Sequence, residues 1–261
     1  MKLQDVPARA GLQWVREGSR IFLRQPLALT GLFFMFWTSV LFLMLVPIVG
    51  MVATLVLAPM GTLGQLLGAE QAKDGKFPWP SCLIAGFRAG REKRKQLLLL
   101  GMINAAAVGL IVAAVFAFAS HEPLEGSKQA AGMVVVSPAS AIAAALQLPL
   151  TLLFTLAPAL TYWHDVPAVK AIFFAMVAVW RNLGAYLVFA LAWGLILAAL
   201  LVAARLIVGL AGPGLGLNLL GPLMMVLLAM ATASLYPMFR DTFRADDPPL
   251  ATEPDNDGDP K

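Results

Sequence analysis

Few side chains in this sequence could act as an acid, a base, a nucleophile or a metal ligand. The chain has two histidines, His121 and His164, and one cysteine, Cys82. His164 adjoins Asp165, but a histidine at a helix end commonly caps backbone carbonyls. No HExxH, Walker, GxSxG or CxxC motif is present. We therefore expect a protein that is not an enzyme and holds no metal ion or cofactor.

Polar, uncharged side chains within apolar stretches form a first candidate site. The fourth apolar stretch, 141–163, carries four of them on one face: Gln147, Thr151, Thr155 and Tyr162. The third stretch, 97–119, carries Asn104. Pro149 and Pro158 interrupt the hydrogen-bond ladder of the fourth stretch, and each frees a carbonyl that needs another partner. The pattern predicts either interhelical hydrogen bonds at a kink or a polar cavity on a permeation path, and both stay open.

Basic side chains at helical spacing form a second candidate site, for lipid headgroups. They recur in two stretches: Arg16, Arg20 and Arg24 in the first, and Arg88, Arg91 and Lys95 in the second. The opposite face of each stretch is apolar, as in helices that lie in the membrane surface with their cations on anionic lipid. Trp14 is expected at the level of the headgroups, where tryptophan is enriched.

Composition indicates that the elements which position these residues lie in a membrane. Hydrophobic residues make up 59% of the chain and charged residues 13%, against about 45–50% and about 25% in soluble domains. Six stretches have the roughly 20 apolar residues that cross a bilayer: 27–46, 48–69, 97–119, 141–163, 183–204 and 217–237. The predicted divisions are a cytoplasmic amphipathic interfacial helix (1–26), a six-span transmembrane domain (27–240) and a disordered acidic cytoplasmic tail (241–261).

The distribution of positive charge predicts the orientation of the chain. A path that alternates through the six stretches leaves two of the 19 Lys and Arg residues, Lys128 and Arg205, on one side and all the others on the opposite side. Cytoplasmic loops carry the excess of Lys and Arg, so both termini are expected in the cytoplasm of a bacterial cell. The same path separates His121 from His164 across the inner membrane, so these histidines cannot share a metal ion.

Self-comparison indicates three copies of one unit, a surface helix followed by two spans. A basic residue and an amide end each surface stretch: Arg24-Gln25, Lys95-Gln96 and Arg181-Asn182. The second span of each unit carries a proline near its cytoplasmic end, followed by an acid: Pro59 with Glu70, Pro158 with Asp165 and Pro237 with Asp241. The surface stretches are predicted at 1–26, 80–96 and 166–182.

Several short motifs resemble those of a known protein family. They include the N-terminal pattern VPARxGxQW followed by RQPLALxGLFF, and the segments Leu57–Pro59, Phe87–Arg88 and Phe239–Asp241. The chain resembles a family of uncharacterised six-span inner-membrane proteins of proteobacteria, mostly beta-proteobacteria. More distantly, its layout is similar to the membrane domain attached to some glycerophosphodiester phosphodiesterases. Because the catalytic domain of those enzymes is missing, this second likeness implies no phosphodiesterase activity.

Together these observations predict an all-α polytopic membrane bundle, with six transmembrane helices in three hairpins and amphipathic helices on the cytoplasmic face. The favoured role is membrane organisation, with binding of lipid or of a protein partner. A transporter or channel for a small neutral or lipidic solute is the alternative. Anionic lipids of the inner leaflet are the expected partners, and nucleic acid is not expected. A second copy of the chain or an unknown membrane partner is left open.

Overall fold

The computed structural model of this protein describes residues 2–119, 138–211 and 213–244, which are almost entirely helical. The helices, in chain order, are α1 (Ala10–Arg24), α2 (Pro26–Met44), α3 (Val49–Lys73), the 3₁₀ helix η1 (Pro80–Ile84), α4 (Ala85–Arg88), α5 (Arg91–Ala119), α6 (Pro138–His164), α7 (Ala168–Arg181), α8 (Leu183–Ala211), α9 (Pro213–Ala233) and α10 (Leu235–Thr242). Six helical segments in this part of the chain are long and apolar enough to cross a membrane. The prediction of an all-α bundle with six spans is confirmed.

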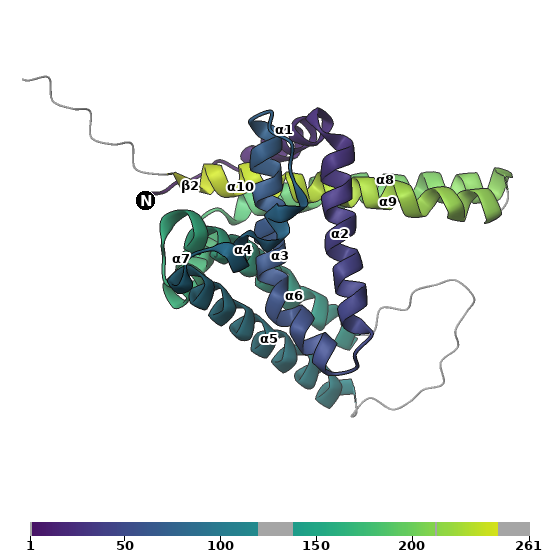
Figure 1. Ribbon diagram of the computed structural model, residues 1–261. Helices are drawn as coiled ribbons and strands as arrows, with labels where there is room; N and C mark the ends of the chain where they lie inside the picture. The colour runs from purple at the N-terminus through teal and green to yellow at the C-terminus, as the bar shows by residue number, and fades with distance from the viewer. Residues whose placement is uncertain (1, 120–137, 212, 245–261) are drawn as a thin grey trace, which may run out of the picture.

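The spans form three hairpins, α2–α3, α5–α6 and α8–α9, that meet at one hub (Figure 1). The first two hairpins pack on each other through α3 and α5, and α8–α9 extends away from them. The second helix of each hairpin lies nearer the hub. In the spanning windows of α3 and α6, 44% of the residues are buried, against 17% in α2 and α5. Lipid is as apolar as leucine, so the outer helices can expose Leu and Phe to the bilayer without penalty.

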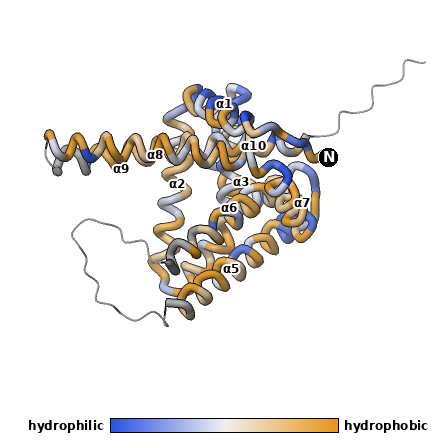
Figure 2. Tube along the Cα trace, turned by 180° about the vertical axis from the view of Figure 1, so that it is seen from behind, coloured by the Kyte–Doolittle hydropathy of each residue, from blue (hydrophilic) through white to orange (hydrophobic). Residues whose placement is uncertain are grey.

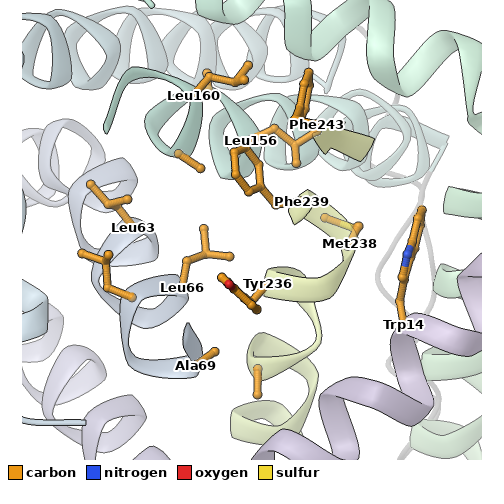
Figure 3. Close-up of a cluster of buried hydrophobic side chains, with 14 of the residues drawn as sticks. Trp14, Leu63, Leu66, Ala69, Leu156, Leu160, Tyr236, Met238, Phe239 and Phe243 are labelled. Carbon is orange, nitrogen blue, oxygen red and sulfur yellow. The ribbon is translucent and has the colours of Figure 1, made fainter. Parts of the chain in front are cut away.

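The hub is a cluster of buried apolar side chains near the ends of the second spans (Figure 3). Its residues include Leu63, Leu66 and Ala69 of α3, Leu156 and Leu160 of α6, and Tyr236, Met238 and Phe239 of α10. Pro237 shapes the last of these spans. It has no amide hydrogen, so the carbonyl of Ala233 loses its usual partner, and the span divides at Ser234 into α9 and α10.

The surface helices pack cyclically on the hairpins. The η1–α4 segment of the second unit packs on α3 of the first unit, and α7 of the third unit packs on α6 of the second. The cycle closes with α1 of the first unit, which packs on α8 and α9 of the third. Each surface helix therefore covers the hairpin of the preceding unit, so three weakly similar units form one continuous fold.

The three junction amides hold this cycle together. Gln25 donates from Nε2 to the carbonyl of Lys76, just before η1, at 3.1 Å. Gln96 accepts from the backbone amide of Ala168, the first residue of α7, at 3.0 Å. Asn182 accepts from the Val6 amide, ahead of α1, at 2.7 Å. Each amide thus binds the backbone that leads into the next unit, which explains why an amide stands at all three junctions.

The structure corrects the expected environment of α1. Its apolar face packs on protein instead of lipid, and Trp14 is 0% exposed. The indole Nε1 of Trp14 donates to Asp241 Oδ2 at 3.1 Å, so the prediction that Trp14 lies among headgroups is wrong. At Gly18, an added Cβ would overlap Ser234, which allows α1 to approach the last span closely. An amphipathic pattern reveals an apolar face but not whether lipid or protein covers it.

Two other expected segments differ in the structure. The second surface stretch, 80–96, is not one helix: η1 and α4 end at Arg88, and α5 begins at Arg91 after an extended Ala89. The predicted tail starts too early, because α10 runs to Thr242 and Phe243–Arg244 (β2) pairs antiparallel with Lys2–Leu3 (β1). This pairing joins the two ends of the described chain. The rest of the predicted tail, 245–261, lies outside the described residues.

Candidate functional site

The outward face of α1 forms one wall of a pocket of about 510 Å³, here called the basic pocket. Its lining residues are Gln13, Arg16, Glu17, Arg20, Ile21 and Arg24 of α1, with Lys73 at the end of α3. The sequence predicted the three arginines as headgroup contacts, and the structure places them around one hollow. Blue, hydrophilic residues gather along α1, whereas the spans are mostly orange (Figure 2).

Helix geometry and chain connectivity fix the position of the basic pocket. Residues four apart lie on one face of a helix, so Arg16, Arg20 and Arg24 line up along α1. Gln25 precedes Pro26, which disfavours helical geometry at Gln25, so α1 ends and α2 starts there. Arg24 donates from Nη1 to the carbonyl of Lys73, the last residue of α3. The pocket therefore lies where the first hairpin begins and ends, at the level of the headgroups if α2 and α3 span the bilayer.

The acid in the wall of the basic pocket is already paired. Arg240 donates from Nη1 and Nη2 to the two carboxylate oxygens of Glu17 at 2.7 and 2.9 Å. It also donates to Asp241 Oδ1 at 2.8 Å. Within the described residues, the ion pairs involve neither Arg16 nor Arg20. The lining of the pocket carries four cations and one carboxylate, Glu17, which is paired with Arg240, so the pocket favours an anion.

The second set of predicted headgroup contacts lies around the start of α5. Arg88 lines a separate pocket of about 250 Å³, together with Cys82 and Tyr162. Arg91 and Lys95 are exposed on the first turns of α5. Positive charge at a helix N-terminus opposes the helix dipole, at a cost of about 0.3–1 kcal/mol per group. Glu92, in the same turn, lies 3.7 Å from the Lys95 ammonium and compensates part of this charge.

Cys82 is not poised for chemistry. Its side chain is buried, and burial raises the pKa of the Cys82 thiol above its ordinary value. A thiol with a raised pKa is neutral at physiological pH and a poor nucleophile. Cys82 instead packs closely against α3, because an added Cβ on Gly64 would lie 2.8 Å from the Cys82 carbonyl oxygen.

Hydrogen bonds within and between helices use most of the predicted cavity residues. Asn104 donates from Nδ2 to the carbonyl of Leu55 at 2.8 Å. The Thr151 and Thr155 hydroxyls donate to carbonyls one turn earlier in α6, at 2.9 and 2.7 Å. Gln147 is exposed and lies 3.5 Å from the Thr151 hydroxyl. Tyr162 lies apart from them, on the pocket of Cys82 and Arg88. The structure does not gather the five residues around one of its main pockets.

Asp165, the neighbour of His164, forms an ion pair with a lysine of another helix. Asp165 turns toward α5 and accepts from Lys93 Nζ at 2.9 Å, while the His164 ring lies 6.1 Å from the Phe239 ring. Asp165 has a φ of 54°, a left-handed conformation that ends α6. The described residues contain no group of three or more His, Cys, Asp or Glu that could hold a metal ion, and His121 lies outside them.

Sequence reasoning missed three residues of the basic pocket and its surroundings. Lys73 was counted only as a loop charge, although a basic residue in the last turn of a helix marks that helix end. Glu17 and Arg240 are 223 residues apart, and no pattern in the sequence relates them. Their ion pair explains how an acid can line a pocket that is otherwise basic.

Comparison with known proteins places the chain among inner-membrane proteins. No protein-family model and no solved structure match it. A protein of Burkholderia thailandensis, named "Probable inner membrane protein BTH_II0599", is 34% identical over 262 residues, which cover 95% of this chain and 96% of the relative. With six helices apolar enough to span a bilayer, the chain is a multi-pass protein of the inner membrane. It belongs to the family of that Burkholderia inner-membrane protein.

Proposed function

We propose that this inner-membrane protein binds anionic phospholipid of the cytoplasmic leaflet through the basic pocket and thereby organises membrane lipid, with no catalytic step. The observation that carries the proposal is the convergence of Arg16, Arg20, Arg24 and Lys73 on one hollow, next to an acid that Arg240 already neutralises. A phosphate diester offers the charge and the acceptor oxygens that arginine binds best.

The position of the basic pocket supports a membrane lipid as the ligand. Arg24 and Lys73 lie at the ends of α1 and α3, beside the start of α2. Basic pockets between transmembrane helices on the cytoplasmic side are a known way to recognise anionic headgroups. The excess of Lys and Arg on this side of the membrane supports a cytoplasmic position for the pocket and for both termini.

The transport alternative has less support. A permeation path needs polar groups that a solute can reach, whereas the hydroxyls of Thr151 and Thr155 are bonded to carbonyls of their own helix. The Asn104 side chain donates to the backbone carbonyl of Leu55 in α3, the helix that contains Pro59. These contacts favour the structural interpretation of the polar face, so we do not assign a solute to it.

The proposal is tested by lipid binding to purified protein in a neutral detergent. Phosphatidylglycerol is titrated, and bound lipid is counted by native mass spectrometry. A triple variant, Arg16→Gln, Arg20→Gln and Arg24→Gln, should lose about 3 kcal/mol of binding free energy, at about 1 kcal/mol for each cation near the headgroup. That loss corresponds to a fall in affinity of roughly 100-fold or more.

A matched triple variant separates the pocket from general charge attraction. Lys76→Gln, Lys170→Gln and Arg205→Gln remove the same charge from exposed side chains that do not line the basic pocket. This control should bind phosphatidylglycerol nearly as well as the unaltered protein. Equal losses in the two triple variants would refute a specific pocket, and unchanged binding in the first would refute the proposed function.

A further inference from the structure

We infer that the basic pocket takes a phospholipid whose headgroup carries two phosphates bridged by a glycerol, the cardiolipin class, in preference to a lipid with a single phosphate. The inference rests on the proposed function and names the ligand of the same pocket. Three features carry it: the length of the pocket, the spread of its cations along that length, and the apolar surface that begins beside it.

The basic pocket is too long for one phosphate. It is lined along α1 from Gln13 to Arg24, which at 1.5 Å per residue is about 16 Å. Arg16 and Arg24 lie about 12 Å apart along the helix axis by the same rise. A single phosphate binds donors about 3 Å from its oxygens, so it leaves one end of the pocket unfilled.

The cations of the pocket are spread along its length. At one end, Arg24 donates from Nη1 to the backbone carbonyl of Lys73, and both residues line the pocket. Arg16 and Arg20 are successive outward residues on α1, about 6 Å apart along its axis. Cations therefore lie at both ends of the pocket, where they can bind two phosphates.

The volume and the charge of the basic pocket fit this ligand. The cavity of about 510 Å³ has room for two phosphates and the bridging glycerol. Two phosphates carry two negative charges. These compensate the four cations of the pocket better than the single charge of phosphatidylglycerol would. The bidentate pairing of Glu17 with Arg240 reduces the repulsion that this carboxylate would exert on a phosphate.

The acyl chains of such a lipid have an apolar surface to lie on. The helix α2 begins at Pro26, two residues after Arg24, and exposes Leu27, Phe34 and Leu41. These residues are seven apart, so they share one face of α2. Leu27, in the first turn, is 88% exposed. Apolar surface for lipid chains therefore starts at the depth of the pocket.

The test compares cardiolipin with phosphatidylglycerol at equal phosphate concentration, with the full chain in a neutral detergent and native mass spectrometry as the readout. Joining two phosphates makes the second contact intramolecular, so cardiolipin should bind at least about tenfold tighter. The variant Arg16→Gln with Arg20→Gln removes the two cations that lie farther from Lys73 along the pocket. It should lower the ratio of the two affinities to near one, while phosphatidylglycerol still binds at Arg24 and Lys73.

The possible outcomes test the inference about cardiolipin and the proposed function separately. Equal binding of the two lipids by the unaltered protein would overturn the inference and leave the proposed function standing. Binding of neither lipid would overturn both. Displacement of cardiolipin by an equal concentration of inorganic phosphate would identify a site for soluble phosphate and refute a lipid ligand. The variant Lys170→Gln with Arg205→Gln loses the same charge elsewhere and should keep the preference, and a lost preference there would also refute the inference.

Discussion

The hydrogen bond between Asn104 and Leu55 should stabilise the fold because a proline leaves the Leu55 carbonyl without a partner in its own helix. Pro59 has no amide hydrogen, so the Leu55 carbonyl, four residues earlier in α3, has no helical partner. Asn104 Nδ2 donates to that carbonyl at 2.8 Å, and Asn104 is 8% exposed, so water cannot easily replace it. Hydrogen bonds between transmembrane helices contribute about 0.6 kcal/mol on average and at most about 1.7 kcal/mol.

Asn104→Leu removes the donor and keeps a similar side-chain volume. An unpaired buried carbonyl costs about 1–3 kcal/mol, so we expect the free energy of unfolding to fall by about 1–2 kcal/mol. In a Pro59→Ala background, the new amide of residue 59 can bond to the Leu55 carbonyl. The cost of Asn104→Leu should then fall to half or less, which a double-mutant cycle measures as a coupling energy.

The assay is reversible unfolding in mixed micelles of a mild detergent and dodecyl sulfate, followed by tryptophan fluorescence. Thr151→Val is the control, because the exposed Thr151 hydroxyl bonds only within α6, to the carbonyl of Gln147 at 2.9 Å. It should change the unfolding free energy by less than about 0.5 kcal/mol. If Asn104→Leu cost the same with Pro59 present or absent, the link between proline and asparagine would be refuted.

Three further predictions concern single positions. The raised pKa of the Cys82 thiol means less thiolate at any given pH, so maleimide labelling should be slow at pH 7 and accelerate only above the ordinary thiol pKa of about 8.5. Moving the thiol to the exposed position of Ser81 should give fast labelling at pH 7. Fast labelling of Cys82 itself would contradict its burial. Gly18→Ala should destabilise by about 1–3 kcal/mol because its Cβ meets the backbone of Ser234, whereas Gly31→Ala, with open space around it, should stabilise by up to about 1 kcal/mol in a thermal melt. A reporter inserted at Gly75 should be active in the cytoplasm, and activity confined to the periplasm would reverse the predicted orientation.

The sequence by itself determined the membrane class and the six spanning helices. Apolar runs of about 20 residues favour spanning helices, since a bilayer has no water to bond backbone groups and a helix satisfies nearly all of them internally. The junction amides Gln25, Gln96 and Asn182 indicated three similar units, although not what each amide binds. Arg16, Arg20 and Arg24 were recognised as one charged face from their spacing alone.

Only the tertiary structure decided which faces meet. An amphipathic pattern could not tell that Trp14 lies in a protein core, that Lys73 joins the arginines of α1, or that Asn104 serves the carbonyl freed by Pro59. The physical reason is that local periodicity depends on neighbours within a turn or two of helix. A contact such as Glu17 with Arg240, 223 residues apart, depends on how the three hairpins pack around a shared hub.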